Sequence, residues 1–172
     1  KEDAVPRRCS EPNWGHGAKR SILTKWARDG LASGEYEPAR LSPWASRPHM
    51  VQKTKRGSAK TDDDFGVRVV GDFVMVNGKT VKKQACAPNI PYQIERAAGR
   101  RAYWYTDGWQ QYKGWGMLEK SRNVAAIWSP LGLIRPTLWQ FGLTNAGVLT
   151  QGHLRVMMER DLDSYSREHI NN

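Results

Sequence analysis

Cysteine is nearly absent from this chain: only Cys9 and Cys86 occur in 172 residues, and they lie far apart. Neither belongs to a Cys-x-x-Cys pair, and no histidine stands at ligand spacing from either one. Zinc sites and disulfide frameworks need such spacing, so neither is indicated. We expect a reducing, intracellular setting, whether cytoplasmic, nuclear or organellar.

Long apolar runs are missing as well. A helix that spans a bilayer needs roughly 18 or more consecutive apolar residues, and no stretch of the chain approaches that length. The first residues also lack a secretory signal pattern. We therefore expect no membrane partner. The chain contains no internal repeat and no low-complexity tract.

Acidic residues are scarce relative to basic ones. The 17 Asp and Glu face 27 Lys and Arg, which gives a formal net charge of +10 and a pI near 9.9. A surplus of this size is typical of proteins that bind polyanions. With membranes set aside, nucleic acid is the favoured partner. A basic protein that is merely soluble is the plainer alternative.

What is present indicates one compact unit of mixed α+β structure. At 172 residues and 19.6 kDa the chain is long enough for one core or for two closely packed subdomains. Residues 1–17 carry several Pro and Gly without periodicity, which predicts an arm rather than a packed element. Apolar residues at helical spacing predict a helix over 19–30, with Gly30 as its stop.

Strands are predicted in the next part of the chain. Residues 41–48 contain two prolines and are not expected to be helical. They lead into a short strand over 49–53 and then a charge-rich loop that begins at Lys53. The Val-rich stretch 67–76 predicts a buried strand interrupted at Gly71. The Asn-Gly pair at 77 and 78 predicts a tight turn after that strand.

The second half of the chain predicts two more strands and one long helix. The strands are expected over 102–106 and 124–128, and the helix, of roughly five turns, from near Asn145. Asp107 ends the first of these strands. Since Asp is depleted inside strands, it needs a reason to be there. It could cap the start of the next element or bind a metal ion, and local sequence alone favours the cap.

Several short blocks occur in a fixed order along the chain. They are Ser-Pro-Trp-Ala-Ser at 42–46, a strand from Arg68 that leads through Asp72 and Phe73 to Asn77, Asp107 with Tyr112 five positions later, an apolar strand with a Pro-x-Gly turn at 126–133, and Phe-Gly-Leu-Thr-Asn-Ala at 141–146. With this order and spacing, the chain from about Ile22 to Met158 resembles the reverse transcriptases of gypsy-class long-terminal-repeat retrotransposons.

The resemblance implies an α+β fold made of the fingers and a partial palm of a right-hand polymerase, truncated before the Asp-Asp hairpin. Such a fragment would bind primer-template and dNTP for RNA-templated DNA synthesis. The implied parts are an N-terminal arm (1–17), fingers (18–81), the first part of the palm with the catalytic Asp strand (82–116), a second part of the fingers (117–140) and an incomplete palm helix (141–172).

The resemblance also implies roles for particular residues. Asp107 would be the catalytic carboxylate and a metal ligand, because two-metal phosphoryl transfer needs several carboxylates around two cations. Tyr112 would be a steric gate that favours deoxynucleotides. The implied nucleotide-binding residues are Lys53, Arg68, Asp72, Gln110, Gln111, Tyr112, Phe141 and Gly142, and the implied nucleic-acid contacts are Gln151 and Arg155.

One defining block of that family has no match within these 172 residues: an aromatic residue followed by Asp-Asp on a hairpin. Asp161 and Asp163 are the nearest carboxylates, and they continue the helical pattern, so we expect them on a solvated helix face. One carboxylate cannot hold two divalent cations. The isolated chain is therefore expected to bind no cofactor and to be inactive, with Mg²⁺ or Mn²⁺ entering only if the remaining carboxylates are supplied by a separate or continuing chain.

Two other interpretations remain open at this stage. A domesticated, non-catalytic fragment could serve as a basic RNA-binding or structural component of a larger assembly. Eight Trp and six Tyr among basic residues suit stacking on single strands of RNA. A small basic β-barrel around residues 67–128 is the weaker alternative, because it leaves the spacing of Asp107, Tyr112 and the 141–146 block unexplained.

Overall fold

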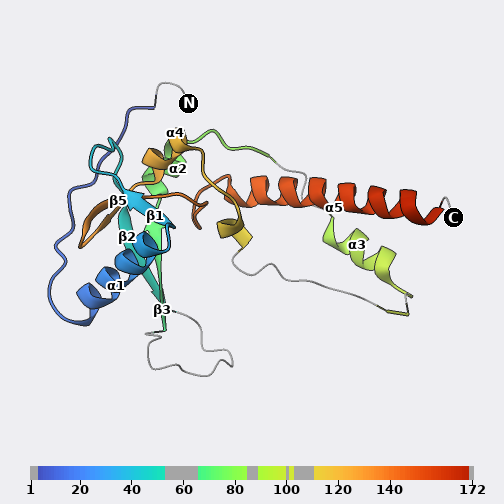
Figure 1. The fold of residues 1–172 in the computed structure, drawn as a ribbon, viewed down its shortest axis with the longest axis horizontal. Coiled ribbons are helices and arrows are strands. Elements are labelled where there is room, and N and C mark those ends of the chain that lie inside the picture. The colour runs from blue at the N-terminus through green and yellow to red at the C-terminus, as the bar shows by residue number, and fades with distance from the viewer. Residues whose placement is uncertain (1–3, 53–65, 85–88, 100, 103–110, 171–172) are drawn as a thin grey trace.

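A computed structural model describes residues 4–52, 66–84, 89–99, 101–102 and 111–170 of the chain. It contains a three-stranded and a two-stranded antiparallel sheet, several short helices and one long C-terminal helix. The strands and the first helix gather in one body, and the long helix projects from it (Figure 1). Mixed α+β structure, as predicted, is therefore confirmed.

Helix α1 (Ala18–Ala32) covers the sheet with one face. Its buried residues Leu23, Ala27 and Gly30 recur at spacings of four and three, which places them on one side of a helix. The helix predicted over 19–30 is confirmed, but Gly30 does not stop it. Gly30 lies inside the helix and packs closely on the ring of Tyr36. A side chain at this position would overlap that ring.

The three-stranded sheet has the order β1-β5-β4, with β1 (Tyr36–Pro38), β4 (Ile127–Ser129) and β5 (Gly132–Pro136). β4 and β5 form a hairpin in which Ser129 pairs with Gly132. Gly132 has φ 105°, a left-handed conformation that glycine adopts without strain. The predicted Pro-x-Gly turn is confirmed, but the strand predicted over 124–128 begins only at Ile127, because Asn123–Ala125 forms a 3₁₀ turn.

The second sheet is the hairpin of β2 (Arg47–Gln52) and β3 (Val67–Asp72). Arg47 pairs with Asp72 and Val51 with Arg68, so these four side chains lie on one face of the hairpin. The strand predicted over 49–53 is confirmed and begins two residues earlier than predicted. The strand predicted over 67–76 is correct only as far as Asp72.

Residues 74–79 form helix α2 (Val74–Lys79) in place of the predicted strand end and tight turn. Asp72 lies two residues before this helix, and its Oδ1 accepts a hydrogen bond from the Val74 backbone N–H at 3.2 Å. Phe73, at the helix start, is 2% exposed and lies in the main core cluster. A strand continued through Phe73 would lose the hydrogen bond between Asp72 and Val74. The strand end and the tight turn predicted over 73–78 were therefore wrong.

The core lies where α1, the two sheets and α2 meet. Its buried hydrophobic residues come from segments distant in sequence, and the central ones are Ala27, Tyr36, Trp44, Phe73, Val76, Ala125, Ile127 and Ile134. Tyr36 donates a hydrogen bond to Gln140 Oε1 at 2.8 Å. Burial, and secondarily the charge of Glu35, raises the pKa of the Tyr36 phenol, so it stays neutral.

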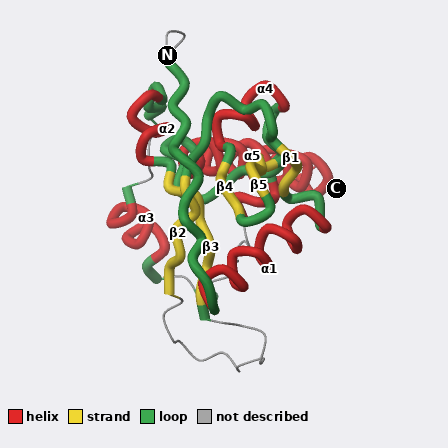
Figure 2. Tube along the Cα trace, turned by 90° about the vertical axis from the view of Figure 1, so that its left-hand side faces the viewer, coloured by secondary structure: helices red, strands yellow, loops and turns green. Residues whose placement is uncertain are grey.

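The N-terminal arm is attached to this body rather than free of it. Arg8 forms a parallel bridge with Ala45, and the Cys9 N–H donates to the Ala45 carbonyl at 3.0 Å. The indole N–H of Trp128 donates to the Cys9 carbonyl at 2.8 Å. Figure 2 shows the arm running along the hairpin. Residues 4–17 of the arm form no helix or strand, but they are packed, which the sequence did not predict.

The remaining elements are helical. They are α3 (Ile90–Ala97), the 3₁₀ turn η1 (Gln111–Gly114), α4 (Glu119–Arg122), η2 (Asn123–Ala125) and α5 (Ala146–Ile170). The long helix predicted from near Asn145 is confirmed and, at 25 residues, is longer than predicted. Among the described residues, no helix is long and apolar enough to cross a membrane.

Candidate functional site

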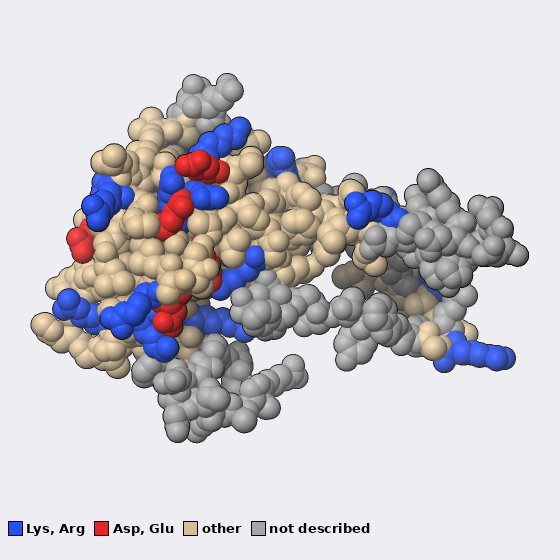
Figure 3. Space-filling view, in the orientation of Figure 1, with Lys and Arg blue, Asp and Glu red and all other residues tan. Residues whose placement is uncertain are grey.

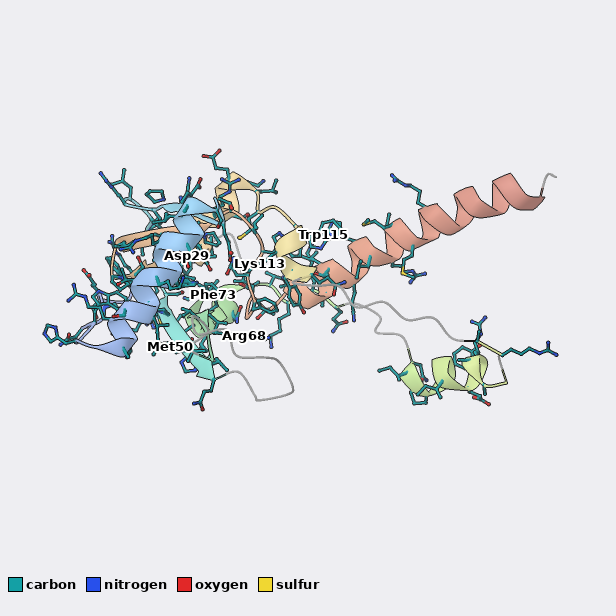
Figure 4. The ribbon with its side chains drawn as sticks, turned by 60° about the horizontal axis from the view of Figure 1, so that its bottom comes forward. Asp29, Met50, Arg68, Phe73, Lys113 and Trp115 are labelled. Atoms are coloured by element: carbon teal, nitrogen blue, oxygen red, sulfur yellow. The ribbon has the colours of Figure 1, made fainter. Side chains whose placement is uncertain are left out.

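Two of the predicted nucleotide-binding residues lie on the same face of β3. Arg68 and Asp72 are separated by an even number of positions on a strand, so their side chains project to the same side. Both are exposed. Figure 4 shows Arg68 on β3 and Phe73 just beyond the end of that strand. The hairpin therefore presents a cation and an anion on an open face.

Two further predicted residues come together across a long separation in sequence. The ring of Tyr112, in η1, packs edge-to-face on the ring of Phe141, with centroids 4.9 Å apart and planes at 79°. Offset and edge-to-face pairs of this kind stabilise a contact by about 0.5–1.5 kcal/mol beyond burial. Gln111 precedes Tyr112 in the same turn. The structure thus joins the turn at Phe141 to η1.

Gly142 connects this aromatic pair to the end of β3. Its φ of 89° is a left-handed conformation, and a Cβ placed on it would lie 3.6 Å from the Gly71 carbonyl oxygen and 3.6 Å from Phe73 Cδ2. The turn therefore approaches the backbone of Gly71, the residue before Asp72, closely. The turn at Phe141 and Gly142 therefore contacts η1 through Tyr112 and the end of β3 through Gly71 and Phe73.

Two asparagines hold the turn against the segment that follows β3. Asn77 donates through Nδ2 to the Gly142 carbonyl at 2.7 Å and accepts through Oδ1 from the Thr144 N–H at 2.9 Å. Asn145 donates to the Val81 carbonyl and accepts from the Lys83 N–H, both at 2.9 Å. Each side-chain amide satisfies two backbone groups, so the turn is fixed at both ends.

The segment that carries Tyr112 has its own anchors in the body. Lys113 Nζ and Glu35 Oε2 form an ion pair at 2.7 Å in which both side chains are partly buried. The Trp139 N–H donates to the Trp115 carbonyl at 2.9 Å. Figure 4 shows Lys113 and Trp115 between the body and the start of α5. Sequence reasoning missed Glu35 and Lys113, since an ion pair between distant residues leaves no local pattern.

The predicted nucleic-acid contacts, Gln151 and Arg155, lie on α5 and are exposed. Their spacing of four residues places them on one side of the helix. Helix α5 begins directly after the turn that carries Phe141 and Gly142, so both residues extend from the same segment as the aromatic pair. On the face seen in Figure 3, basic side chains outnumber acidic ones and are spread over several places.

Several predicted residues lie outside the described part of the chain. They are Lys53, Asp107 and Gln110, together with most of the strand predicted over 102–106. The side chains of Asp161 and Asp163 are likewise not described. Within the described residues, no group of three or more His, Cys, Asp or Glu could hold a metal ion.

A cleft of about 630 Å³ lies on another side of the same turn. It is bounded by α2, residues 116–125, Trp139 and the first turns of α5. Leu143 and Thr144 line it, whereas Tyr112 and Phe141 do not. The sequence offered no signal for this cleft, because its walls come from four separate stretches of chain: 76–83, 116–125, Trp139 and 143–153.

No protein-family model matches the chain, and a search of curated protein sequences finds no match. The function of the chain is therefore inferred from its residues and their arrangement.

Proposed function

We propose that the chain is the fingers and partial palm of a reverse transcriptase, which binds primer-template and dNTP and needs further carboxylates for catalysis. One observation carries the proposal. Tyr112 packs on Phe141 although the two residues come from distant segments, and Gly142, next to Phe141, lies against Gly71 and Phe73, the two neighbours of Asp72; the family resemblance assigns Asp72, Tyr112, Phe141 and Gly142 to the nucleotide site.

Each residue suits its proposed role. The Arg68 guanidinium offers forked donors that match phosphate oxygens, and it is exposed on the open face of the hairpin. Tyr112 is held by Phe141 and by its neighbour Lys113, so its ring has the fixed position that a steric gate requires. Gly142 lets the backbone approach a bound nucleotide closely.

The nucleic-acid strand would lie along the open face of the hairpin. Arg47, His49 and Arg68 share that face, because their positions in the paired strands alternate in step. Cations with an aromatic ring between them suit contact with phosphates and bases. Gln151 and Arg155 of α5 would contact the strand further along. Asp107 would supply one metal ligand, with Mg²⁺ or Mn²⁺ bound only when the remaining carboxylates are present.

Nucleotide binding by the chain tests the proposal directly. We expect Arg68→Gln to weaken dGTP binding by about tenfold, since charge-assisted hydrogen bonds to phosphate are lost. Arg20→Gln, an exposed arginine of α1, is the matched control and should change nothing. Tyr112→Ala should narrow the preference for dGTP over GTP. Equal effects of the two arginine variants, or no dGTP binding at all, would argue against the nucleotide site.

A second experiment separates the polymerase from the RNA-binding alternative. A longer protein that continues beyond residue 172 and contains the Asp-Asp hairpin should extend a primer with Mg²⁺. The Asp107→Asn variant of that protein should not. The 172-residue chain should bind primer-template with a steep salt dependence but not extend it. RNA binding without dNTP binding, unaffected by Arg68→Gln, would favour the non-catalytic RNA-binding component.

A further inference from the structure

The cleft beside the turn has a lining that the proposed nucleotide site does not use. Its walls include Val76 of α2, Leu143 of the turn and Leu149 of α5, and the buried residues Ala125 and Ala146 lie at its base. A volume of about 630 Å³ falls within the usual range for small-molecule sites. The walls are mainly apolar, so a ligand would gain most of its affinity by removing apolar surface from water.

One wall of the cleft is aromatic. Trp139 lines it and packs edge-to-face on His153, with centroids 6.1 Å apart. Trp115 packs on His153 at 4.7 Å on a tilted plane. His153 is also held by its Nδ1, which lies 2.8 Å from the Leu149 carbonyl oxygen. A flat apolar ligand would therefore find a ring surface that is already fixed.

Most polar groups of the cleft are already satisfied. The amides of Asn77 and Asn145 each make two bonds to the backbone, and the Thr80 hydroxyl donates to the Val76 carbonyl at 2.9 Å. Lys83 is different. Its backbone N–H is fixed by Asn145, whereas its exposed side chain makes no hydrogen bond or ion pair within the described residues.

The charge of the cleft is one-sided. Lys83 is its charged lining residue, His153 is its other titratable one, and none of the described lining residues is acidic. A buried or half-buried negative group on a ligand is favourable only where a cation or donor meets it. Within the described part of the chain, the cleft is apolar with one lysine among its lining residues, and this matches a ligand of complementary form.

We propose that this cleft binds a small amphipathic anion, an aromatic compound with one carboxylate or sulfonate. The aromatic part lies against Trp139 and the apolar walls, and the anionic group meets Lys83. The site is separate from the Tyr112–Phe141 contact and does not depend on the proposed function. Because Leu143, Thr144 and Asn145 line the cleft, a bound ligand also contacts the turn that carries Phe141.

The test uses two fluorescent probes on the whole chain. The anionic probe is 1-anilinonaphthalene-8-sulfonate, and the neutral probe is N-phenyl-1-naphthylamine, which has the same ring system without the charge. We expect saturable binding of the anionic probe at one site. Lys83→Gln should weaken it by about tenfold, because a charge-assisted contact is lost. The neutral probe should be nearly unaffected by that substitution.

Lys82→Gln is the matched control, since Lys82 is an exposed neighbour that does not line the cleft. Lys83→Arg, which keeps the charge, should restore most of the affinity. Ser121→Trp, placed at the lining of α4, should block both probes. Circular dichroism and thermal melting verify folding, and if Ser121→Trp does not fold, the lysine series decides alone.

Equal effects of Lys82→Gln and Lys83→Gln overturn the proposal. So does undiminished binding of both probes to a folded Ser121→Trp variant, or binding of the anionic probe at many equivalent sites. A loss confined to Lys83→Gln and to the anionic probe supports it.

Discussion

The body of the molecule and the middle of α5 differ in how deeply their apolar side chains are buried. In the body, side chains from α1, both sheets and α2 close around Phe73 and Ile127, which are 2% and 0% exposed. In the middle of α5, the apolar side chains of Val156, Met157 and Met158 are 65%, 51% and 61% exposed. Figure 1 shows that this part of the helix extends beyond the body.

The contrast falls within a single helix. The first turns of α5 bury Ala146 and Thr150, and the Thr150 hydroxyl donates back to the Ala146 carbonyl at 2.8 Å. Two to three turns further along the same helix, Val156, Met157 and Met158 are exposed. Helices in proteins gain most of their stability from tertiary packing. We therefore expect substitutions in the body to change the free energy of unfolding strongly, and substitutions at Val156, Met157 and Met158 of α5 to change it little.

The largest effect is expected at Phe73. Phe73→Ala should lower the free energy of unfolding by roughly 3–5 kcal/mol, because a large buried ring is lost and a cavity remains. Urea denaturation followed by tryptophan fluorescence measures this. Phe141→Ala removes an equally large ring that is 40% exposed and packs on Tyr112, so it should cost about 1 kcal/mol. Equal urea midpoints for the two variants would contradict the assignment of the core.

The next largest effect on stability is expected at Gly71 of β3, which is compared with Gly78 of α2. Alanine at Gly71 would place its Cβ 2.7 Å from Phe73 Cε2 and 2.9 Å from Ile127 Cδ1. Gly71→Ala should therefore destabilise the body by about 1–3 kcal/mol through overpacking. Gly78→Ala, in α2 with open space around it, should be neutral or stabilise by up to about 1 kcal/mol. Thermal melting of the two variants in parallel shows whether close packing or glycine itself matters.

A smaller effect is expected for the amide that fixes the turn. Asn77→Ala removes the bonds to Gly142 and Thr144 and should cost roughly 1–2 kcal/mol. It should also increase hydrogen exchange at the Thr144 amide, which loses its acceptor. Asn13→Ala, which removes one exposed bond to the Gly15 N–H in the arm, is the control. Unchanged exchange at Thr144 would show that the turn holds without Asn77.

The smallest effect on the free energy of unfolding is expected at Met157 of α5. Met157→Lys should change the free energy of unfolding by no more than about 0.5 kcal/mol, because an exposed position loses little packing. Thr150→Lys, two turns earlier on the same helix and 3% exposed, should destabilise strongly, since it buries a charge. A strong loss of stability with Met157→Lys would indicate that this face is covered in solution.

Local patterns predicted much of the secondary structure. The periodicity of Leu23 and Ala27 indicated α1, and Pro130 with Gly132 indicated the β4–β5 turn, because both signals lie within a few residues of the element they describe. The prediction failed from Phe73 to Gly78. A Val-rich stretch favours a strand, but the Asp72 side chain accepts a hydrogen bond from the Val74 N–H and the core takes up Phe73. Tertiary burial overrode the local preference there.

The candidate site was predicted as a set of residues rather than as an arrangement. The sequence singled out Asp72, Tyr112, Phe141 and Gly142, but it could not say what holds them in place. Asn77, Glu35 and Lys113 perform that task through contacts between distant segments. The cleft at Lys83 escaped prediction for the same reason.

The sequence by itself determined the basic charge, the mixed α+β composition and the order of its blocks, since these follow from residue types and from neighbours along the chain. Only the tertiary structure decided that Gly142 lies against Gly71, that Tyr112 packs on Phe141 and that α5 is buried at Ala146 and Thr150 but exposed from Val156 to Met158. Such contacts depend on how separate elements pack, and packing is a property of the whole fold rather than of any one segment.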